Sequence, residues 1–134
     1  MPAMRKKRVF DSFALLAYLK KEAQFEKVRV FLTEEDPQIF INDINIGEIY
    51  FILERERGEE QAELFLKLIF PSLPVQRAEN SFQDVIGAAK IKSKFAISFA
   101  DCFAAVTAMK QNAVLVTGDP DFKKLEGRIQ IEWI

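Results

Sequence analysis

Short apolar runs that alternate with segments of helical periodicity are the feature that most constrains this chain. The β-type runs occupy residues 8–10, 38–41, 74–78, 113–117 and 128–134, and amphipathic helical patterns lie between them. The run AVLVT (113–117) is continuously apolar up to its threonine, which is typical of a strand buried on both faces of a parallel sheet. The alternation predicts an α/β fold with three α/β/α layers around a mostly parallel central sheet.

The predicted helices have recognisable ends. Ser12 is the expected N-cap of the first helix, and Gly58 is the expected C-cap of the third. Pro71 and Pro74 stop the fourth helix. The helical patterns cover 13–23, 25–32, 42–57, 59–70, 82–89 and 99–106, with a short helical turn around 120–125.

Bulk properties limit the class of protein. A chain of 134 residues predicts one domain over residues 1–134. Cys102 is the only cysteine, which fits a reducing compartment. No apolar stretch approaches the ~18 residues of a membrane span, and the N-terminal sequence lacks the apolar core of a signal peptide. We therefore expect a cytoplasmic protein with no membrane partner.

The absence of histidine from the sequence narrows the possible chemistry. It excludes Ser-His-Asp and Cys-His nucleophiles and histidine-based zinc sites. The net charge of −1 provides no overall attraction to nucleic acid, which argues against a protein that coats DNA or RNA. An enzyme that binds phosphodiesters through metal ions remains compatible with this charge.

Two acids directly follow predicted strands. Asp11 follows 8–10, and Asp119 follows 113–117. Because ligands bind beyond the carboxyl ends of parallel strands, these two acids are expected on the same rim of the sheet. The alternative is a local role for each, with Asp11 assisting a helix cap and Asp119 forming a turn with Pro120.

A third acid, Glu48, lies on the apolar face of the helix predicted over 42–57, where its neighbours include Ile44 and Phe51. A buried carboxylate needs a cation, a hydrogen-bond donor or an edge position near water. A structural salt bridge to Arg55 is the alternative explanation.

A fourth acid, Asp101, stands three residues after Ser98, which is the spacing of a capping box. The same residue shares one side of its helix with the small residues Ala104, Ala105 and Ala108. Small side chains beside an acid leave room for an ion or a substrate, so both interpretations remain open.

Together, Asp11, Glu48, Asp101 and Asp119 converge from two strand ends and two flanking helices. Clustered carboxylates repel one another and need a counter-cation to remain ionised. Hard oxygen ligands without histidine or cysteine select Mg²⁺ or Mn²⁺. The pattern predicts an acidic metal site.

These four acids lie in three segments, VFDSFALLAYLKKE (9–22), INIGEIYFIL (44–53) and SFADCFAAVTAMKQNAVLVTGDPDF (98–122). In this order and spacing the segments resemble the PIN domain family, and more closely its small members, the VapC-like toxins of toxin–antitoxin pairs. The resemblance covers nearly the whole chain. It implies a Mg²⁺- or Mn²⁺-dependent ribonuclease that cleaves RNA phosphodiesters.

The resemblance also implies a role for each site residue. The metal ligands would be Asp11, Asp101 and Asp119, with Glu48 a ligand directly or through water. Two hydroxyls, Ser12 and Thr117, would support the ligands or contact phosphate, and Asp121 would be either an auxiliary acid or a turn residue. Many relatives carry a hydroxyl two residues after the first aspartate, where this chain has Phe13.

Partners follow from the same resemblance, because VapC-like proteins commonly form homodimers and are inhibited by a small antitoxin. The helix predicted over 59–70 carries a wide apolar stripe, in which Leu64 and Leu68 extend the face of Ala62 and Phe65. Such a stripe fits an interface. The alternative is that the helix is simply well buried.

RNA affinity is expected from metal ions and local basic runs, because the net charge is −1. Lys92 and Lys94 precede the helix of Asp101, whose N-terminus favours phosphate, so we expect these lysines to bind RNA. The basic run 5–8 lies at the end of its strand opposite the acids.

Two other functions compete with the ribonuclease. One is a PIN-like interaction module that binds metal without turnover. The other is an aspartyl-phosphate enzyme built on Asp11 and Asp119, although Phe13 stands where a phosphatase motif places an acid.

Overall fold

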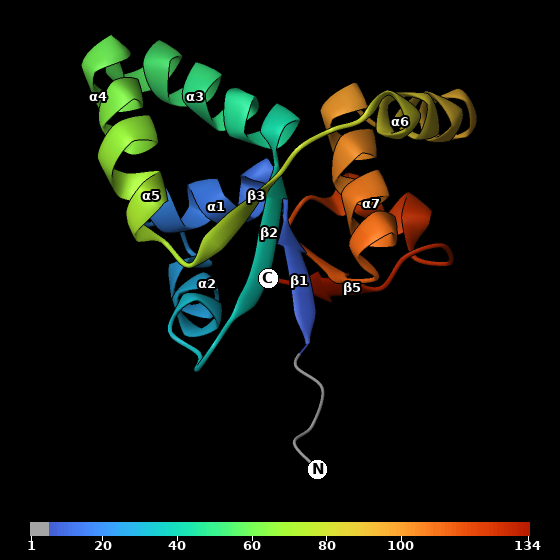
Figure 1. Cartoon of the computed structure of the whole chain (residues 1–134), viewed down its shortest axis with the longest axis horizontal. Coiled ribbons are helices and arrows are strands. Elements are labelled where there is room, and N and C mark those ends of the chain that lie inside the picture. The colour runs from blue at the N-terminus through green and yellow to red at the C-terminus, as the bar shows by residue number, and fades with distance from the viewer. Residues whose placement is uncertain (1–5) are drawn as a thin grey trace.

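A five-stranded parallel sheet forms the centre of the computed structural model, which describes residues 6–134 (Figure 1). Its strand order is β3-β2-β1-β4-β5, and every neighbouring pair is parallel. The predicted α/β class with a parallel sheet is confirmed. The strands are β1 (Lys7–Phe10), β2 (Gln38–Asn42), β3 (Val75–Ala78), β4 (Val114–Thr117) and β5 (Ile131–Trp133).

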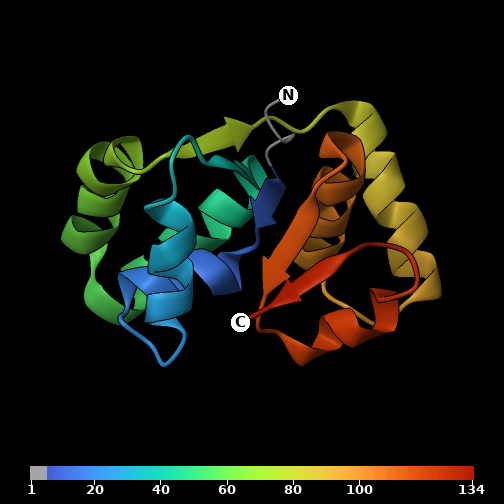
Figure 2. The same cartoon turned by 90° about the horizontal axis from the view of Figure 1, so that it is seen from below.

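Helices cover both faces of the sheet, as Figure 2 shows from below, with α1 to α5 on one face and α6 and α7 on the other. Short 3-10 and π segments complete the helical set. The elements are α1 (Ser12–Leu19), α2 (Phe25–Leu32), α3 (Asp43–Arg57), α4 (Glu59–Leu64), the π-helix η1 (Phe65–Ile69), α5 (Phe70–Ser72), α6 (Phe82–Lys94), α7 (Phe99–Gln111) and the 3-10 helix η2 (Pro120–Leu125).

Two hydrophobic cores form because side chains alternate along each strand. Phe10 and Val116 belong to the core beneath α1, α2 and α3. Their neighbours Val9 and Leu115 belong to the core beneath α6 and α7. This two-sided burial explains why residues 113–116 are continuously apolar.

The helix boundaries correct two sequence predictions. The N-cap of α1 is Asp11, whose side chain accepts a hydrogen bond from the Ala14 backbone N–H, whereas Ser12 is the first helical residue. The single helix predicted over 59–70 is divided into α4, η1 and α5, where the Phe70 N–H binds the Phe65 carbonyl across five residues. Gly58 ends α3 with a φ of 94°, as predicted.

The Ser98 half of the predicted capping box is present, since Ser98 Oγ accepts from the Asp101 N–H at 3.1 Å. A box with both reciprocal bonds forms at the start of α6, between Ser81 and Asp84. Within residues 6–134, no helix has the length and apolar character needed to cross a membrane.

Candidate metal and active site

Asp11 and Asp119 lie at the same edge of the sheet, because β1 and β4 are adjacent parallel strands. Asp11 is buried, and one carboxylate oxygen accepts from the Ala14 N–H at 2.9 Å. Its other oxygen accepts from Thr117 Oγ1 at 2.5 Å. The cap role and the rim position, which the sequence left as alternatives, are therefore both realised by one side chain.

The pKa of Asp11 is raised from 3.8 to about 7. Burial is the largest cause, and the nearby charges of Asp101 and Asp119 raise the pKa further. The hydrogen bonds from Thr117 and Ala14 oppose these effects. The two hydrogen bonds therefore do not fully compensate the negative charge of the buried Asp11 carboxylate.

Thr117 connects Asp11 to the turn that carries Asp119. While its hydroxyl donates to Asp11, the same oxygen accepts from the Asp119 backbone N–H at 3.0 Å. Thr117 is fully buried, so this arrangement is sheltered from competing water. The predicted supporting role of Thr117 has a geometric basis.

Asp101, Asp119 and Asp121 form a cluster of three acids that could hold a metal ion, and it is the one such group found among residues 6–134. Each offers one carboxylate oxygen, and the three oxygens lie within 4.8 Å of one another. Asp121 also forms the local turn, because its N–H donates to Asp119 Oδ1 at 2.9 Å. The predicted turn role of Asp121 is thus present, and its role as an auxiliary acid stays a prediction that its place in the cluster allows.

The pKa of Asp101 is raised to about 6. Burial is again the largest cause, and the hydroxyl of Ser98 opposes it. The charges of Asp119, Glu48 and Asp121 raise the pKa further, which places all of these acids within electrostatic reach of Asp101. Oxygen donors that repel one another in this way suit Mg²⁺ or Mn²⁺.

Glu48 faces the cluster from α3 and accepts a short hydrogen bond from Ser12 Oγ. The predicted apolar burial of its helix face is wrong, since Phe51 is 56% exposed and Ile44 is also exposed. The suggested partner Arg55 instead lies over the Phe51 ring, 4.9 Å from its centroid. Glu48 is thus a half-buried acid at the rim of the sheet, and Ser12 donates a hydrogen bond to it.

Two buried asparagines that sequence reasoning missed join the helices of Glu48 and Asp101. Asn42 caps α3 by accepting from the Asn45 N–H at 2.8 Å, and its amide donates to Asn45 Oδ1 at 2.8 Å. Asn45 in turn donates to the Ala100 carbonyl at 3.3 Å, next to Asp101. The signal was available, because an asparagine after an apolar strand is a favoured N-cap.

Phe13 stands two residues after Asp11, at the position where the family resemblance leads one to expect a hydroxyl. Its ring packs against Gly118. A Cβ atom at residue 118 would lie only 2.3 Å from Phe13 Cε1. The absence of a side chain at Gly118 is therefore what admits the phenyl ring beside the turn of Thr117 and Asp119.

The two basic runs differ in how their side chains are used. Lys92 and Lys94 are both exposed, and Lys92 Nζ donates to the Ile97 carbonyl at 2.6 Å. In the N-terminal run, Arg8 is buried and its guanidinium binds Glu34 at 2.8 Å and Glu132 at 3.0 Å. Arg5 falls outside the described residues. RNA binding by Lys92 and Lys94 stays a prediction.

A profile of the PIN domain matches residues 8–128. The chain belongs to the PIN domain family. The sequence resemblance to this family is thereby confirmed, with the acids at the carboxyl edge of a parallel PIN-domain sheet. No curated protein sequence was found to match the chain.

Solved structures share the PIN fold over nearly the whole chain. VapC20 of Mycobacterium tuberculosis, described as a sarcin-ricin loop cleaving toxin, has a TM-score of 0.75 and 17% identity, over 88% of this chain and 94% of its own. DNA-bound VapBC of Salmonella typhimurium has a TM-score of 0.74 and 18% identity, over 96% and 98%. VapBC2 of Rickettsia felis, bound to promoter DNA, has a TM-score of 0.73 and 16% identity, over 95% and 98%.

Proposed function

We propose that this PIN-domain protein is a Mg²⁺- or Mn²⁺-dependent ribonuclease and the toxin of a toxin–antitoxin pair. The observation that carries the proposal is the convergence of Asp101, Asp119 and Asp121, with Asp11 and Glu48 in electrostatic reach. Five acids at one edge of the sheet, with raised pKa values on the two buried ones, fit a site completed by a cation. Family membership and the VapC-like fold support the same conclusion.

In this proposal Asp101, Asp119 and Asp121 hold the cation, and Asp11 joins them in an orientation fixed by Thr117. When bound, the cation neutralises charge on a phosphodiester and lowers the pKa of water. Glu48 lies across from this group, oriented by Ser12, where it is available to bind the cation directly or through water. The hydrogen bond from Asn45 to the Ala100 carbonyl joins α3 to α7, and in this way fixes Glu48 relative to Asp101.

The test is RNA cleavage by the purified protein with Mg²⁺ or Mn²⁺, with and without EDTA. Cleavage should require the metal and should be lost in the Asp119→Asn variant. Glu35→Gln is the matched control, since Glu35 is an exposed acid three residues before β2, at the opposite edge of the sheet. Undiminished cleavage in EDTA would exclude the metal mechanism, and metal binding without cleavage of any RNA would favour the interaction module.

An antitoxin partner and a homodimer belong to the same proposal. The matched VapBC structures are complexes of toxin and antitoxin. In this chain the α4–η1 segment leaves Leu64, Leu66 and Leu68 exposed, with Leu68 at 66%. Ala62 and Phe65 are buried, so the predicted stripe divides into a core face and an exposed apolar face. We assign this exposed face to the homodimer interface.

A further inference from the structure

The sheet edge beside the acids carries an exposed aromatic side chain. Trp133 ends β5 and pairs in parallel register with Thr117, the residue that hydrogen-bonds Asp11. The next residue fixes this end of the chain, because the Ile134 N–H donates to the Thr117 carbonyl at 3.1 Å. Neighbouring strands lie about 4.8 Å apart. The backbone of Trp133 is therefore one strand away from the carboxylate rim.

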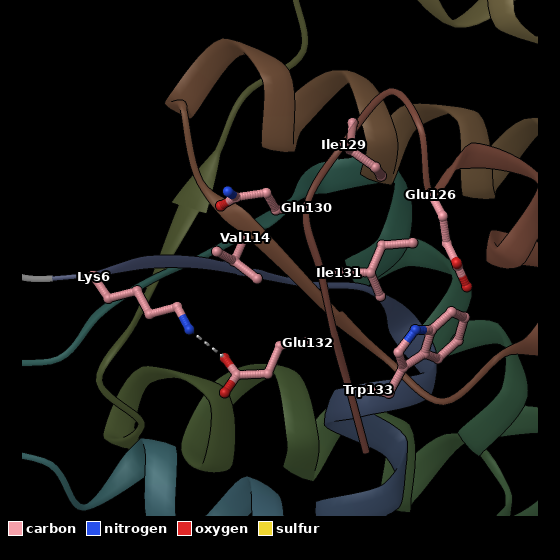
Figure 3. Close-up of a pocket in the computed structure, with 8 residues that line it drawn as sticks. All are labelled: Lys6, Val114, Glu126, Ile129, Gln130, Ile131, Glu132 and Trp133. Atoms are coloured by element: carbon pink, nitrogen blue, oxygen red, sulfur yellow. Dashed lines mark ion pairs between the residues drawn. The ribbon is translucent and has the colours of Figure 1, made fainter.

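A hollow of about 510 Å³ opens along β5 and includes Trp133 (Figure 3). This volume lies within the roughly 300–1,000 Å³ range of small-molecule sites. Val114 and Ile131 contribute apolar surface, and the indole is 37% exposed. Figure 3 shows Trp133 at the end of the hollow away from Lys6, beside Ile131 and Glu126.

The charges of the hollow disfavour a phosphate there. Among the described residues that line it, Lys6 is the only cation, and its ammonium pairs with Glu132 at 3.4 Å. Glu132 also receives Arg8 at 3.0 Å, and the second acid, Glu126, is exposed. A neutral planar group suits this surface better than the sugar–phosphate backbone does.

We propose that Trp133 is a stacking platform for an unpaired base of the RNA substrate, placed beside the scissile site. The inference rests on the proposed ribonuclease function and adds to it a contact that selects single-stranded segments. A base–aromatic stack accepts any base but requires one that has left its helix. It also supplies affinity without positive charge, which a chain of net charge −1 needs.

The indole is its own reporter, because Trp133 is the only tryptophan in the sequence. The Asp101→Asn variant, which should bind RNA without cutting it, would be titrated with a single-stranded RNA hexamer. We expect the tryptophan emission to be quenched by the hexamer. Two matched probes, the same hexamer closed in a duplex and an abasic hexamer of equal charge, should quench far less. Equal quenching by all three, or none by the single strand, overturns the proposal.

Substitutions at residue 133 give an independent measure in the same Asp101→Asn background. Trp133→Leu should weaken hexamer binding by about 5- to 150-fold, the loss expected for one stacked base, while Trp133→Phe should retain most of the affinity. Unchanged affinity in Trp133→Leu overturns the proposal. A blue shift of the emission with rising protein concentration, in the absence of RNA, would assign the hollow to a protein interface and also overturn it.

The outcomes separate this inference from the proposed function. Metal-dependent cleavage by the wild-type protein, with no quenching by the hexamer, would retain the ribonuclease and remove the stacking site. Base-dependent quenching in a protein that cleaves no RNA would retain the site and remove the ribonuclease.

Discussion

The phenyl ring of Phe13 lies against Gly118, so closely that a Cβ atom at residue 118 would stand 2.3 Å from Cε1 and 2.7 Å from Cζ of the ring. Phe13 follows Ser12, the donor to Glu48, and Gly118 separates Thr117 from Asp119. One apolar contact therefore fixes the start of α1 against the turn that carries the acids.

This contact predicts that Gly118→Ala destabilises the protein by about 1–3 kcal/mol, the usual effect of overpacking, and reduces cleavage because Asp119 is displaced. Phe13→Ala should restore much of the loss when it is combined with Gly118→Ala. Chemical denaturation and cleavage rates of the four proteins form a double-mutant cycle. Gly127→Ala is the control, since a Cβ there meets nothing within 4 Å. Additive effects of the two substitutions would show that the ring and the turn are not coupled.

Neutral amides at the four principal acids, Asp11, Glu48, Asp101 and Asp119, should each lower the cleavage rate by about two orders of magnitude or more while the fold persists. For Asp101→Asn, the N-cap is retained because Ser98 accepts from the backbone N–H of residue 101. Ser98→Ala removes the cap and the hydroxyl that lowers the pKa of Asp101, but it leaves the Asp101 carboxylate in place, so it should reduce stability by about 1 kcal/mol with cleavage largely intact. If Ser98→Ala and Asp101→Asn were equally inactive, capping would explain the importance of Asp101.

The raised pKa of Asp11, about 7 against 3.8, predicts how stability depends on pH in the absence of metal. Between these values the folded protein retains a proton that the unfolded chain releases, so the free energy of unfolding should fall as pH rises from about 4 to 7. Asp11→Asn should flatten this slope, as thermal melts in EDTA would show. Metal affinity should rise over the same interval, because the cation displaces the protons. A wild-type slope equal to that of Asp11→Asn would contradict the assignment.

Lys94 is the better position at which to test where RNA binds. Lys92 also donates to the Ile97 carbonyl, so a substitution of Lys92 would in addition disturb the loop before α7. Lys94→Gln should weaken RNA binding and reduce the slope of log affinity against log salt by about one counterion. Lys92→Gln should have the same effect on the slope, with an added loss of stability. The matched control is Lys7→Gln, an exposed lysine of the N-terminal run. An effect of Lys7→Gln larger than that of Lys94→Gln would move the RNA path to the other end of the sheet.

Association through the α4–η1 face should be visible by sedimentation at micromolar concentration. The wild-type protein should sediment as a dimer. Leu68→Ser should shift it toward the 15.4 kDa monomer, because a side chain that is largely exposed in the single chain would no longer contribute apolar surface to the interface. Phe82→Ser is the control, since Phe82 is 78% exposed but lies on α6, on the opposite face of the sheet. A monomeric wild-type protein would remove the homodimer from the proposal.

The sequence by itself determined the alternation of strands and helices, the two-sided burial of 113–117, and the placement of Asp11 and Asp119 at one rim. These features are local or periodic, so they are written in the spacing of neighbouring residues. The position of Gly58 at the end of α3 was predictable for the same reason, because its positive φ favours glycine.

The tertiary structure alone decided which side chains meet across the chain. Arg8 pairs with Glu132, Ser12 with Glu48, Asn45 with Ala100, and Phe13 with Gly118. None of these contacts follows from propensity or period, because each depends on how two packed elements are offset and on what volume a neighbour leaves free. The sequence could therefore identify the candidate acids, whereas the packing of α1, α3 and α7 against the sheet raised the pKa values of Asp11 and Asp101 and gave Glu48 its hydrogen bond from Ser12.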